Sequence, residues 1–514
     1  MPRPGLAAAI LLILAAGARC PAAGSPLVPC DPAAGPGAVT LMIHGETARP
    51  FSLMDLKGVT ERLLTRVNTR IVTRRSREVL PEDIAAADYV VLMGIGPWPA
   101  EGDLPPIDPA KPVLVCGMPP RGSAGWPGSQ KTPQKVESWQ AATVSVGGAS
   151  FRTDVSYFIP GAPAGSDEVL AGITGGGRKS ALAWRNGNRF WFASLPSEPA
   201  TGYAFSAILP AFYGAADPGA GGVLLTLEAF HAGCDPAVLR RAADWLASKN
   251  HAFAISVRVP ADGTDPARMR DFFSALQYAQ SRRGRIFLIA DAGALWDAAL
   301  DRPPSAPVVE AGVKGLERDF RTCLDNGLLP LGVRLADSGL GAAASERLAD
   351  VFTLSLGASQ ASDATALATF SPGTITRLAG RLVVLPASPW FQPGQPAAAG
   401  QAHNLLLLPG TVLGISVPAW LPFAKAAEIL KAADGLTSPF LDAADAAASV
   451  STGLGAIWTA GSGSLKPKFS GRAQLKGFDA TAQPISTAEV EAGTLEPVAG
   501  VEGASMTTLI PCDP

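Results

Sequence analysis

This chain has almost no net charge, and it contains few cysteines and histidines. Its 514 residues carry 42 Lys and Arg against 44 Asp and Glu, and this net charge of −2 gives no electrostatic basis for binding nucleic acid or an anionic membrane surface. The six cysteines are too sparse for a disulfide scaffold, and the absence of any CxxC motif or Cys/His cluster argues against a zinc finger or ribbon. No GxGxxG motif follows the first predicted strand and no GxxxxGK(S/T) motif occurs, so a nucleotide site has no support.

Apolar residues, in contrast, are plentiful enough for a large folded core. The apolar content is 47% and the charged content 17%, which excludes wholesale disorder. A chain of this length predicts about two to four domains. The 55 glycines and 46 prolines indicate many turns and long loops between the elements.

Long apolar runs are confined to the N-terminus. The run Leu6–Ala16 has the length of a signal-peptide core, and cleavage is expected after Ala18 or Gly24, so residues 1–24 are interpreted as a signal peptide. Cys20 raises the alternative of a lipoprotein, which Arg19 disfavours because a small residue is expected before the lipidated cysteine. We expect an exported protein, periplasmic or secreted, with no transmembrane segment in its mature form.

Two similar cysteine segments lie near the ends of the chain. The segment Val28-Pro-Cys-Asp-Pro32 is echoed by Ile510-Pro-Cys-Asp-Pro514. In an oxidising compartment, Cys30 and Cys512 could form a disulfide that closes the chain end to end. The alternative is that the two tails resemble each other by coincidence.

Within a predicted domain of residues 38–215, residues 38–120 alternate between predicted strands and helices, which indicates a parallel, doubly wound sheet, and residues 141–215 consist mainly of predicted strands. His44 follows the first strand, either as part of a ligand site or in a polar turn. Cys116 precedes Gly117 at another strand end, as in a nucleophile elbow, but no histidine lies between it and His231 to serve as base, so we interpret it as a core cysteine. The predicted elements are strands at 39–43, 70–73, 89–93, 112–116, 142–146, 181–184 and 189–193 and helices at 56–67, 82–86 and 201–213.

Residues 220–448 repeat strand and helix, beginning with a strand–helix–strand unit over Gly222–Val259. Seven or eight such units predict a closed or nearly closed β/α barrel. Residues 449–514 are rich in Gly, Ser and Ala and are expected to form either a small β-rich appendage or a poorly ordered tail. The predicted elements are strands at 223–227, 253–257, 285–290, 331–336, 351–356, 382–385 and 404–408 and helices from 236, at 266–281, 310–326 and 422–433.

Three acidic residues each end a predicted strand of this barrel: Glu228, Asp291 and Asp337. If the strands are parallel, all three carboxylates surround the same opening. They could act as the acid and base of a glycoside hydrolase, hydrogen-bond to sugar hydroxyls, or cap the helices that follow.

Other candidate binding residues follow the strands. His231 lies in the first loop, three residues after Glu228. Trp296, Trp390 and Trp420 follow strands or strand-end loops, where aromatic platforms near acids suit sugar binding, although tryptophan in a core or lid is the commoner case.

Several stretches carry a resemblance to a known family. They are GNRFWFASLP from Gly187 to Pro196, VLLTLEAF from Val223 to Phe230, and DPAVLRRAADWLASKNHAFAISV from Asp235 to Val257. Over roughly residues 38–440 the chain resembles the YdaL-like branch of the polysaccharide deacetylase superfamily. The resemblance implies a flavodoxin-like N-terminal domain followed by a distorted (β/α) barrel of the polysaccharide deacetylase type.

The chemistry of that family needs a divalent metal held by an aspartate and two histidines. In this sequence the metal-binding aspartate is replaced by Ala229 and the two histidines by Ile289 and Gly293, although the adjacent acid survives as Glu228. The family's later Pro-His element is represented only by Arg334-Leu-Ala-Asp337, and its late histidine is missing before Pro418. The resemblance therefore implies that the zinc site is lost, and no cofactor is expected.

These observations predict a pseudoenzyme: an exported, polysaccharide-deacetylase-like protein that is catalytically degenerate. We expect it to bind a polysaccharide or oligosaccharide, or to act as an accessory factor to envelope or exopolysaccharide machinery proteins. One alternative is an active carbohydrate hydrolase, of the deacetylase or glycoside hydrolase type, that uses Glu228, Asp291 and Asp337. The other is a purely structural or interaction module.

Overall fold

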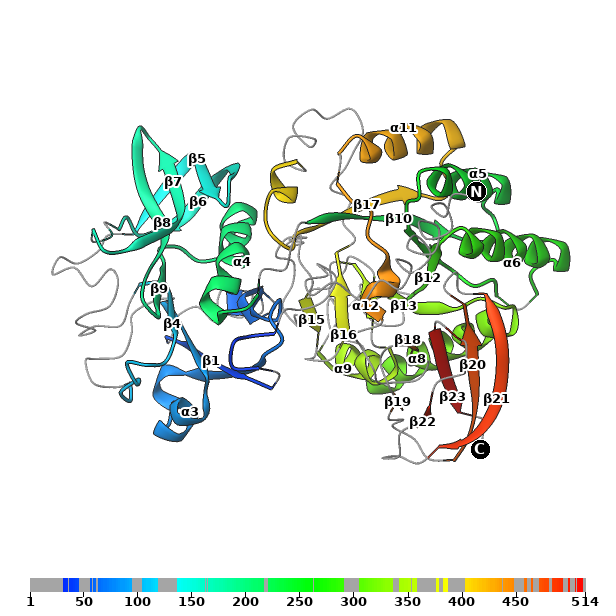
Figure 1. The fold of residues 1–514 in the computed structure, drawn as a ribbon, viewed down its shortest axis with the longest axis horizontal. Coiled ribbons are helices and arrows are strands. Elements are labelled where there is room, and N and C mark those ends of the chain that lie inside the picture. Colours follow the sequence, from blue (N-terminus) through cyan, green and yellow to red (C-terminus); the bar gives the residue numbers. More distant parts are fainter. Residues whose placement is uncertain are drawn as a thin grey trace, which may run out of the picture.

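The computed structural model shows an α/β protein whose described residues form two large sheets and two smaller ones (Figure 1). It describes residues 31–45 except 36, 56–94 except 58 and 62, 104–118, 136–216 except 162 and 164, 221–290 except 262, 305–335, 342–357 except 353, 376–378, 382–386, 403–447 except 437, 457–459, 464–465, 471–492 except 480–482, 498–499, 504 and 506–511.

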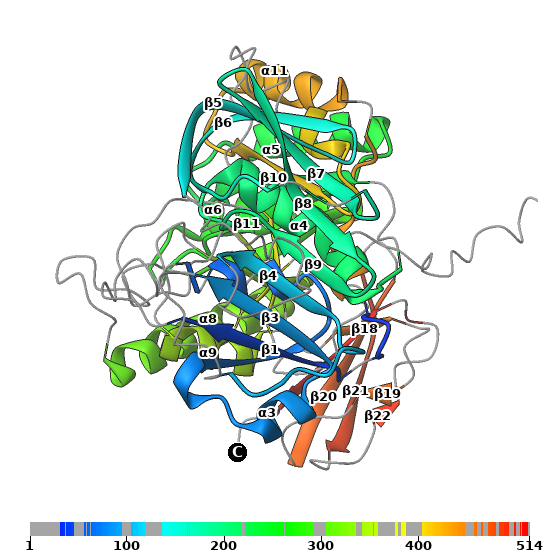
Figure 2. The ribbon, with the colours of Figure 1, turned by 90° about the vertical axis from the view of Figure 1, so that its left-hand side faces the viewer.

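The first sheet has nine strands in the order β2-β1-β3-β4-β9-β8-β7-β5-β6. The first five in this order pair in parallel, and the other four continue the sheet in antiparallel fashion (Figure 2). The strands β1, β3 and β4 are buried apolar runs, as expected for strands covered on both faces, whereas the edge strand β2 contains three arginines and is only partly buried. Their bounds are β1 Val39–His44, β2 Arg70–Arg75, β3 Tyr89–Gly94, β4 Val113–Gly117, β5 Glu137–Val146, β6 Ala149–Phe158, β7 Glu168–Gly175, β8 Arg178–Asn186 and β9 Arg189–Phe192.

Helical segments flank this sheet. Residues 56–57, 59–61 and 63–64 are helical, followed by η2 (Ser76–Glu78), α3 (Pro81–Ala86) and α4 (Pro199–Tyr213). The predicted strands and helices of this part are present, but β6 and β7 were not predicted. Both belong to antiparallel hairpins with alternating buried and exposed residues, a weaker sequence signal than a continuous apolar run.

The second sheet has eight strands in the order β15-β16-β14-β13-β12-β11-β10-β17. Seven of them pair in parallel and curve into a nearly closed, barrel-like sheet, and β15 joins its end in antiparallel fashion. The strands are β10 Gly222–Phe230, β11 Phe253–Val257, β12 Gly284–Ile289, β13 Pro330–Arg334, β14 Leu354–Leu356, β15 Thr376–Leu378, β16 Leu382–Leu385 and β17 Val412–Pro418.

Among the described helices, four connect strands of this sheet and a fifth, α11, follows its last strand β17. They are α5 Pro236–Ser248, α6 Pro266–Ser281, α8 Ala306–Asp325, α9 Ala342–Val351 and α11 Phe423–Asp434. Asp235 and Asp265 each accept a hydrogen bond from the backbone two residues on, and proline occupies the next position, so α5 and α6 begin where the Asp-Pro pairs predicted.

One predicted strand of this part is wrong, and another is shorter than predicted. Residues 403–406 form a helical turn, where a strand over 404–408 was predicted. Leu405 and Leu408 are buried while Leu407 is exposed, which is helical spacing within an apolar run. The strand predicted at 351–356 is limited to β14, because α9 extends to Val351.

The C-terminal part contains strands. One sheet has the order β18-β23-β20-β21, and β19 pairs with β22. Lys476 lies 3.7 Å from Asp325, at the end of α8, so this sheet packs beside the amino end of β13. The strands are β18 Ile457–Thr459, β19 Ser464–Leu465, β20 Gly471–Phe478, β21 Pro484–Ala492, β22 Val498–Ala499 and β23 Met506–Pro511.

The first sheet contacts the second near the amino end of β17. The buried Arg66 donates hydrogen bonds to the Ser206 carbonyl, at 2.7 Å, and to the Pro409 carbonyl. Asn404 donates to the Ser150 carbonyl at 2.7 Å. Both barrel residues precede β17, so the contact lies at the end of the barrel opposite to the carboxyl ends of its strands.

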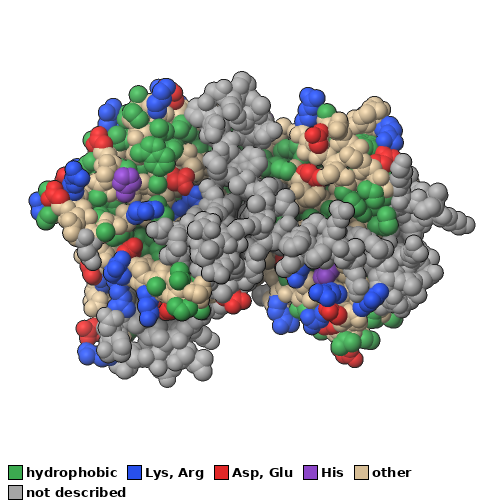
Figure 3. Space-filling model, turned by 180° about the vertical axis from the view of Figure 1, so that it is seen from behind, with side chains coloured by type: hydrophobic (Ala, Val, Ile, Leu, Met, Phe, Trp, Pro, Cys, Tyr) green, Lys and Arg blue, Asp and Glu red, His purple; other side chains and the backbone are tan. Residues whose placement is uncertain are grey.

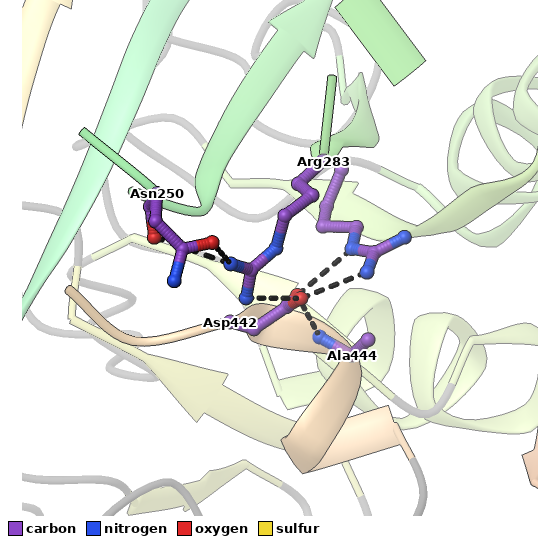
Figure 4. Close-up of polar contacts among 5 residues, drawn as sticks. Asn250, Arg283, Asp442 and Ala444 are labelled. Atoms are coloured by element: carbon purple, nitrogen blue, oxygen red, sulfur yellow. Dashed lines mark hydrogen bonds and ion pairs between the residues drawn. The ribbon is translucent and has the colours of Figure 1, made fainter. Parts of the chain in front are cut away.

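A short segment after α11 lies against the amino end of the barrel. Val223 of β10 exchanges backbone hydrogen bonds with Pro439 and Leu441. Asp442, which precedes α12 (Ala443–Ala447), accepts two hydrogen bonds of 2.8 Å from Arg285 of β12 (Figure 4).

Candidate functional site

The carboxyl end of β10 carries a bulge. The strand was predicted to end at Leu227, but it continues to Phe230 because the register with β11 shifts between these two residues. Ala229 takes a left-handed conformation with φ of 59°, and its backbone N–H donates to Ser256 Oγ at 2.8 Å. A non-glycine residue in this conformation is strained, and such strain concentrates at functional sites.

Glu228, at this bulge, pairs with an arginine from across the barrel. Arg334, at the end of β13, donates to Glu228 Oε1 from Nε at 2.8 Å and lies 2.6 Å from the same oxygen through Nη2. The Arg334 side chain is 6% exposed and that of Glu228 is 23% exposed. Because two strands separate β10 from β13, this ion pair spans the interior of the barrel.

The position of Arg334 depends on a glycine of the neighbouring strand. Arg334 Nη1 donates to the Leu335 carbonyl, and Gly357 follows β14 beside them with φ of +123°. A Cβ at Gly357 would meet Arg334 Nη1 and lie 2.8 Å from the Leu335 oxygen. Glycine is therefore required for Arg334 to reach Glu228 in this geometry.

The interior of the barrel has a polar side and an apolar side at this level. Arg334 is in register with Leu356, which in turn is in register with Leu385, and both leucines are buried. On the other side, the register partner of Glu228 is Pro418 of β17. The polar groups at this level are thus Glu228 of β10 and Arg334 of β13, and the apolar residues Leu356, Leu385 and Pro418 belong to β14, β16 and β17.

Trp420 lies at the same edge. The Ala419 N–H, just beyond β17, donates to the Glu228 carbonyl at 2.7 Å. The next residue, Trp420, is 60% exposed. The structure therefore brings two of the predicted site residues, Glu228 and Trp420, to the same edge of the sheet.

His231 belongs to a turn at this edge. Its side chain is exposed, and Nδ1 accepts a hydrogen bond from the Gly233 N–H at 3.0 Å. With Nδ1 as acceptor, a neutral ring carries its proton on Nε2, which can only donate. Cys234, in the same turn, is buried, and burial raises the pKa of its thiol, which argues against a reactive thiolate.

Several predicted site residues lie outside the described residues. They are Asp291, Asp337, Trp296 and Trp390, together with the predicted disulfide partners Cys30 and Cys512. Convergence of the three carboxylates therefore stays a prediction.

The residues at the positions of the family's metal ligands do not fit a divalent metal. Ala229 offers a methyl group and Ile289 a half-buried hydrocarbon side chain, neither of which can coordinate a cation. Within the described residues, no group of three or more His, Cys, Asp or Glu side chains is arranged to hold a metal ion.

His44, Cys116 and His251 have structural surroundings that lie away from the carboxyl ends of the barrel strands. His44 is buried at the end of β1, and burial lowers its pKa while its Nδ1 lies 3.1 Å from the Gly45 carbonyl oxygen. Cys116 is fully buried, which raises its pKa, as expected of a core cysteine. His251 precedes β11 at the amino end of the barrel, where it contacts Asp434 at 2.9 Å.

Arg334 was not predicted as a site residue. Its sequence separation of 106 residues from Glu228 leaves no local pattern that joins the two. One signal was available: an arginine at the end of the apolar run Pro330–Arg334, whose residues are all buried, requires a buried anion as partner.

No protein-family model and no curated protein matches the chain. Within the described residues, no helix combines the length and the apolar character needed to cross a membrane. Lys, Arg, Asp and Glu side chains are interspersed over the described surface in Figure 3. Fold and site together define an α/β protein with a barrel-like parallel sheet and an ion pair across its interior.

Proposed function

We propose that this protein binds a carbohydrate without turning it over, at the carboxyl ends of the barrel strands. In this proposal it is an exported, polysaccharide-deacetylase-like accessory factor in exopolysaccharide or cell-envelope processing. The observation that carries the proposal is the partly buried Glu228–Arg334 ion pair at the same edge as the exposed Trp420.

The strand order supports the proposed architecture. The parallel part of the first sheet, β2-β1-β3-β4-β9, follows the 2-1-3-4-5 order of flavodoxin-like sheets, with β5 to β8 inserted before the fifth parallel strand. The seven parallel strands of the second sheet suit a distorted, incompletely closed (β/α) barrel. We therefore propose a flavodoxin-like domain followed by a barrel of the polysaccharide deacetylase type.

The electrostatics of the ion pair favour a neutral polar ligand. Arg334 would attract an anionic ligand and Glu228 would repel it. A cationic ligand would be attracted by Glu228 and repelled by Arg334, so the ion pair favours neither an anionic nor a cationic ligand. Both described contacts between Glu228 and Arg334 involve Oε1, so Oε2 can accept a hydrogen bond from a ligand hydroxyl. Sugars offer many such hydroxyls.

Trp420 supplies the second contact that a sugar requires. The flat face of an indole packs against the C–H face of a pyranose ring, while the carboxylate accepts from the hydroxyl edge. Loss of both the metal-binding aspartate and the histidines leaves no group to activate water in the family's manner, so binding without hydrolysis follows.

A glycan array followed by calorimetry tests this proposal. Oligosaccharides that bind wild-type protein should bind Trp420→Ala about 10-fold more weakly, the loss expected for an aromatic anchor. Ile485→Ala, an exposed apolar residue of β21, is the matched control and should bind as wild type does. Absence of binding to every oligosaccharide would instead favour the structural or interaction module.

A second measurement separates binding from catalysis. The proposal predicts no acetate release and no stoichiometric metal in the purified protein. Stoichiometric zinc that a chelator removes together with a deacetylase activity would refute it.

A further inference from the structure

Two hydroxyl side chains lie one step deeper in the barrel than Glu228. Thr226 of β10 and Ser416 of β17 are register partners, as are Glu228 and Pro418 two residues further on. Because residues two apart on a strand point to the same face, Thr226 and Ser416 share the interior face with Glu228. On its other side Thr226 is in register with Ala254 of β11, so only small side chains flank it.

Neither hydroxyl has a hydrogen-bond partner in the part of the chain that the structure describes. Thr226 is 0% exposed, and both Thr226 Oγ1 and Ser416 Oγ are buried without a hydrogen-bond partner among the described residues. The nearby Ser256, by contrast, accepts from the Ala229 N–H. Buried polar atoms without partners are uncommon and costly, so two on adjacent strands need an explanation.

We propose that Thr226 and Ser416 form the inner end of the binding site and hold one hydroxyl group of the carbohydrate ligand. This inference rests on the proposed function and specifies the depth to which the ligand enters. A hydroxyl group both donates and accepts, and therefore matches two rotatable side-chain hydroxyls that each need a partner. The neighbouring ion pair, which is neutral as a whole, favours an uncharged group at this level over a carboxylate or an ammonium.

The position of Ser416 offers a route to this level. Among the described strands, β17 pairs with β10 alone, so the barrel is not closed beyond it. The residue Ser416 is partly exposed, although its Oγ is buried, whereas its partner Thr226 is fully buried. A ligand hydroxyl that passes the Glu228 side chain would therefore reach Ser416 first.

Calorimetry with an oligosaccharide that the wild-type protein binds tests the inference. Thr226→Val, which keeps the branched shape, and Ser416→Ala should each weaken binding about 10-fold, the loss expected for one buried hydrogen bond. Neither variant should unfold at a lower temperature, because each removes an unsatisfied hydroxyl. Ser355→Ala is the control, since Ser355 Oγ already donates to the Val383 carbonyl. Ser355 also lies on the face of β14 opposite to Leu356, the register partner of Arg334.

The outcomes distinguish this inference from the proposed function. Wild-type affinity in both Thr226→Val and Ser416→Ala would overturn the inner subsite and leave carbohydrate binding intact. A crystal structure of the complex with only a water molecule between the two hydroxyls would overturn it as well. A wild-type protein that binds no oligosaccharide would reject both.

Discussion

Replacement of Asp442 by asparagine should destabilise the barrel strongly, because it removes the carboxylate that forms a bidentate ion pair with a buried arginine. Arg285 and Asp442 form two hydrogen bonds of 2.8 Å, and their side chains are 4% and 11% exposed. Arg283 lies 3.7 Å from Asp442 but is 36% exposed, so water can hydrate its charge after the change (Figure 4). Arg285 has no such access.

The magnitude follows from this burial. Removal of one partner of a buried ion pair costs about 3–5 kcal/mol. Asparagine keeps the shape of aspartate and can still accept the 3.0 Å hydrogen bond from the Ala444 N–H, so the loss reports the charge. At a urea m value of about 2–3 kcal/mol/M, the unfolding midpoint should fall by about 1–2 M.

Urea unfolding followed by tryptophan fluorescence measures this change. Glu428→Gln is the matched control, because Glu428 forms an exposed pair with Lys425 and its loss should cost no more than about 0.5 kcal/mol. A loss in Asp442→Asn as small as that of the control would refute the reasoning. Replacement of the pair by Arg285→Met with Asp442→Leu should restore much of the stability.

Three further predictions concern the same barrel. Gly357→Ala should lower the unfolding free energy clearly more than Gly176→Ala. At Gly176 the φ of +56° strains alanine by about 1–2 kcal/mol, but no other atoms lie near the added Cβ. Equal losses in chemical denaturation would show that Gly357 is not needed to position Arg334. Ala229→Gly should leave stability unchanged or raise it by up to about 1 kcal/mol, since glycine relieves the left-handed strain, and a decrease in the same assay would contradict this account of the bulge. Burial raises the pKa of Asp442, but the hydrogen bonds and charge of Arg285 outweigh this effect, so the pKa in the folded protein lies below the usual 3.8. The stabilisation by ionised Asp442 is therefore present above pH 3.8 and is lost as the pH falls through the folded pKa. Acidification should then reduce the unfolding free energy of the wild-type protein more than that of Asp442→Asn.

The elements that the sequence predicted best are those with a local physical cause. Strand Phe253–Val257 and helix Pro266–Ser281 match their predicted bounds, because one is a buried apolar run and the other begins at an Asp-Pro cap. Residues 404–408 failed because a short apolar run suits a strand and a helical turn equally well, and only the buried Leu405 and Leu408 decide between them.

The ion pairs of the barrel could not be predicted from the sequence. Glu228 is 106 residues from Arg334, and Arg285 is 157 residues from Asp442, so each pair exists only after the strands are arranged. An arginine within a buried apolar strand was the available signal, since it requires an anion but does not say which one. The strain at Ala229 could not be predicted either, because alanine gives no sign of a left-handed conformation.

We propose above that the barrel binds carbohydrate without turning it over. The most direct test is to incubate the wild-type protein with an acetylated oligosaccharide at concentrations that saturate binding, and to assay acetate and new reducing ends. We predict that neither rises above the protein-free control. Release of either product that Glu228→Gln abolishes, while binding and unfolding stay as in wild type, would contradict the account and identify a hydrolase.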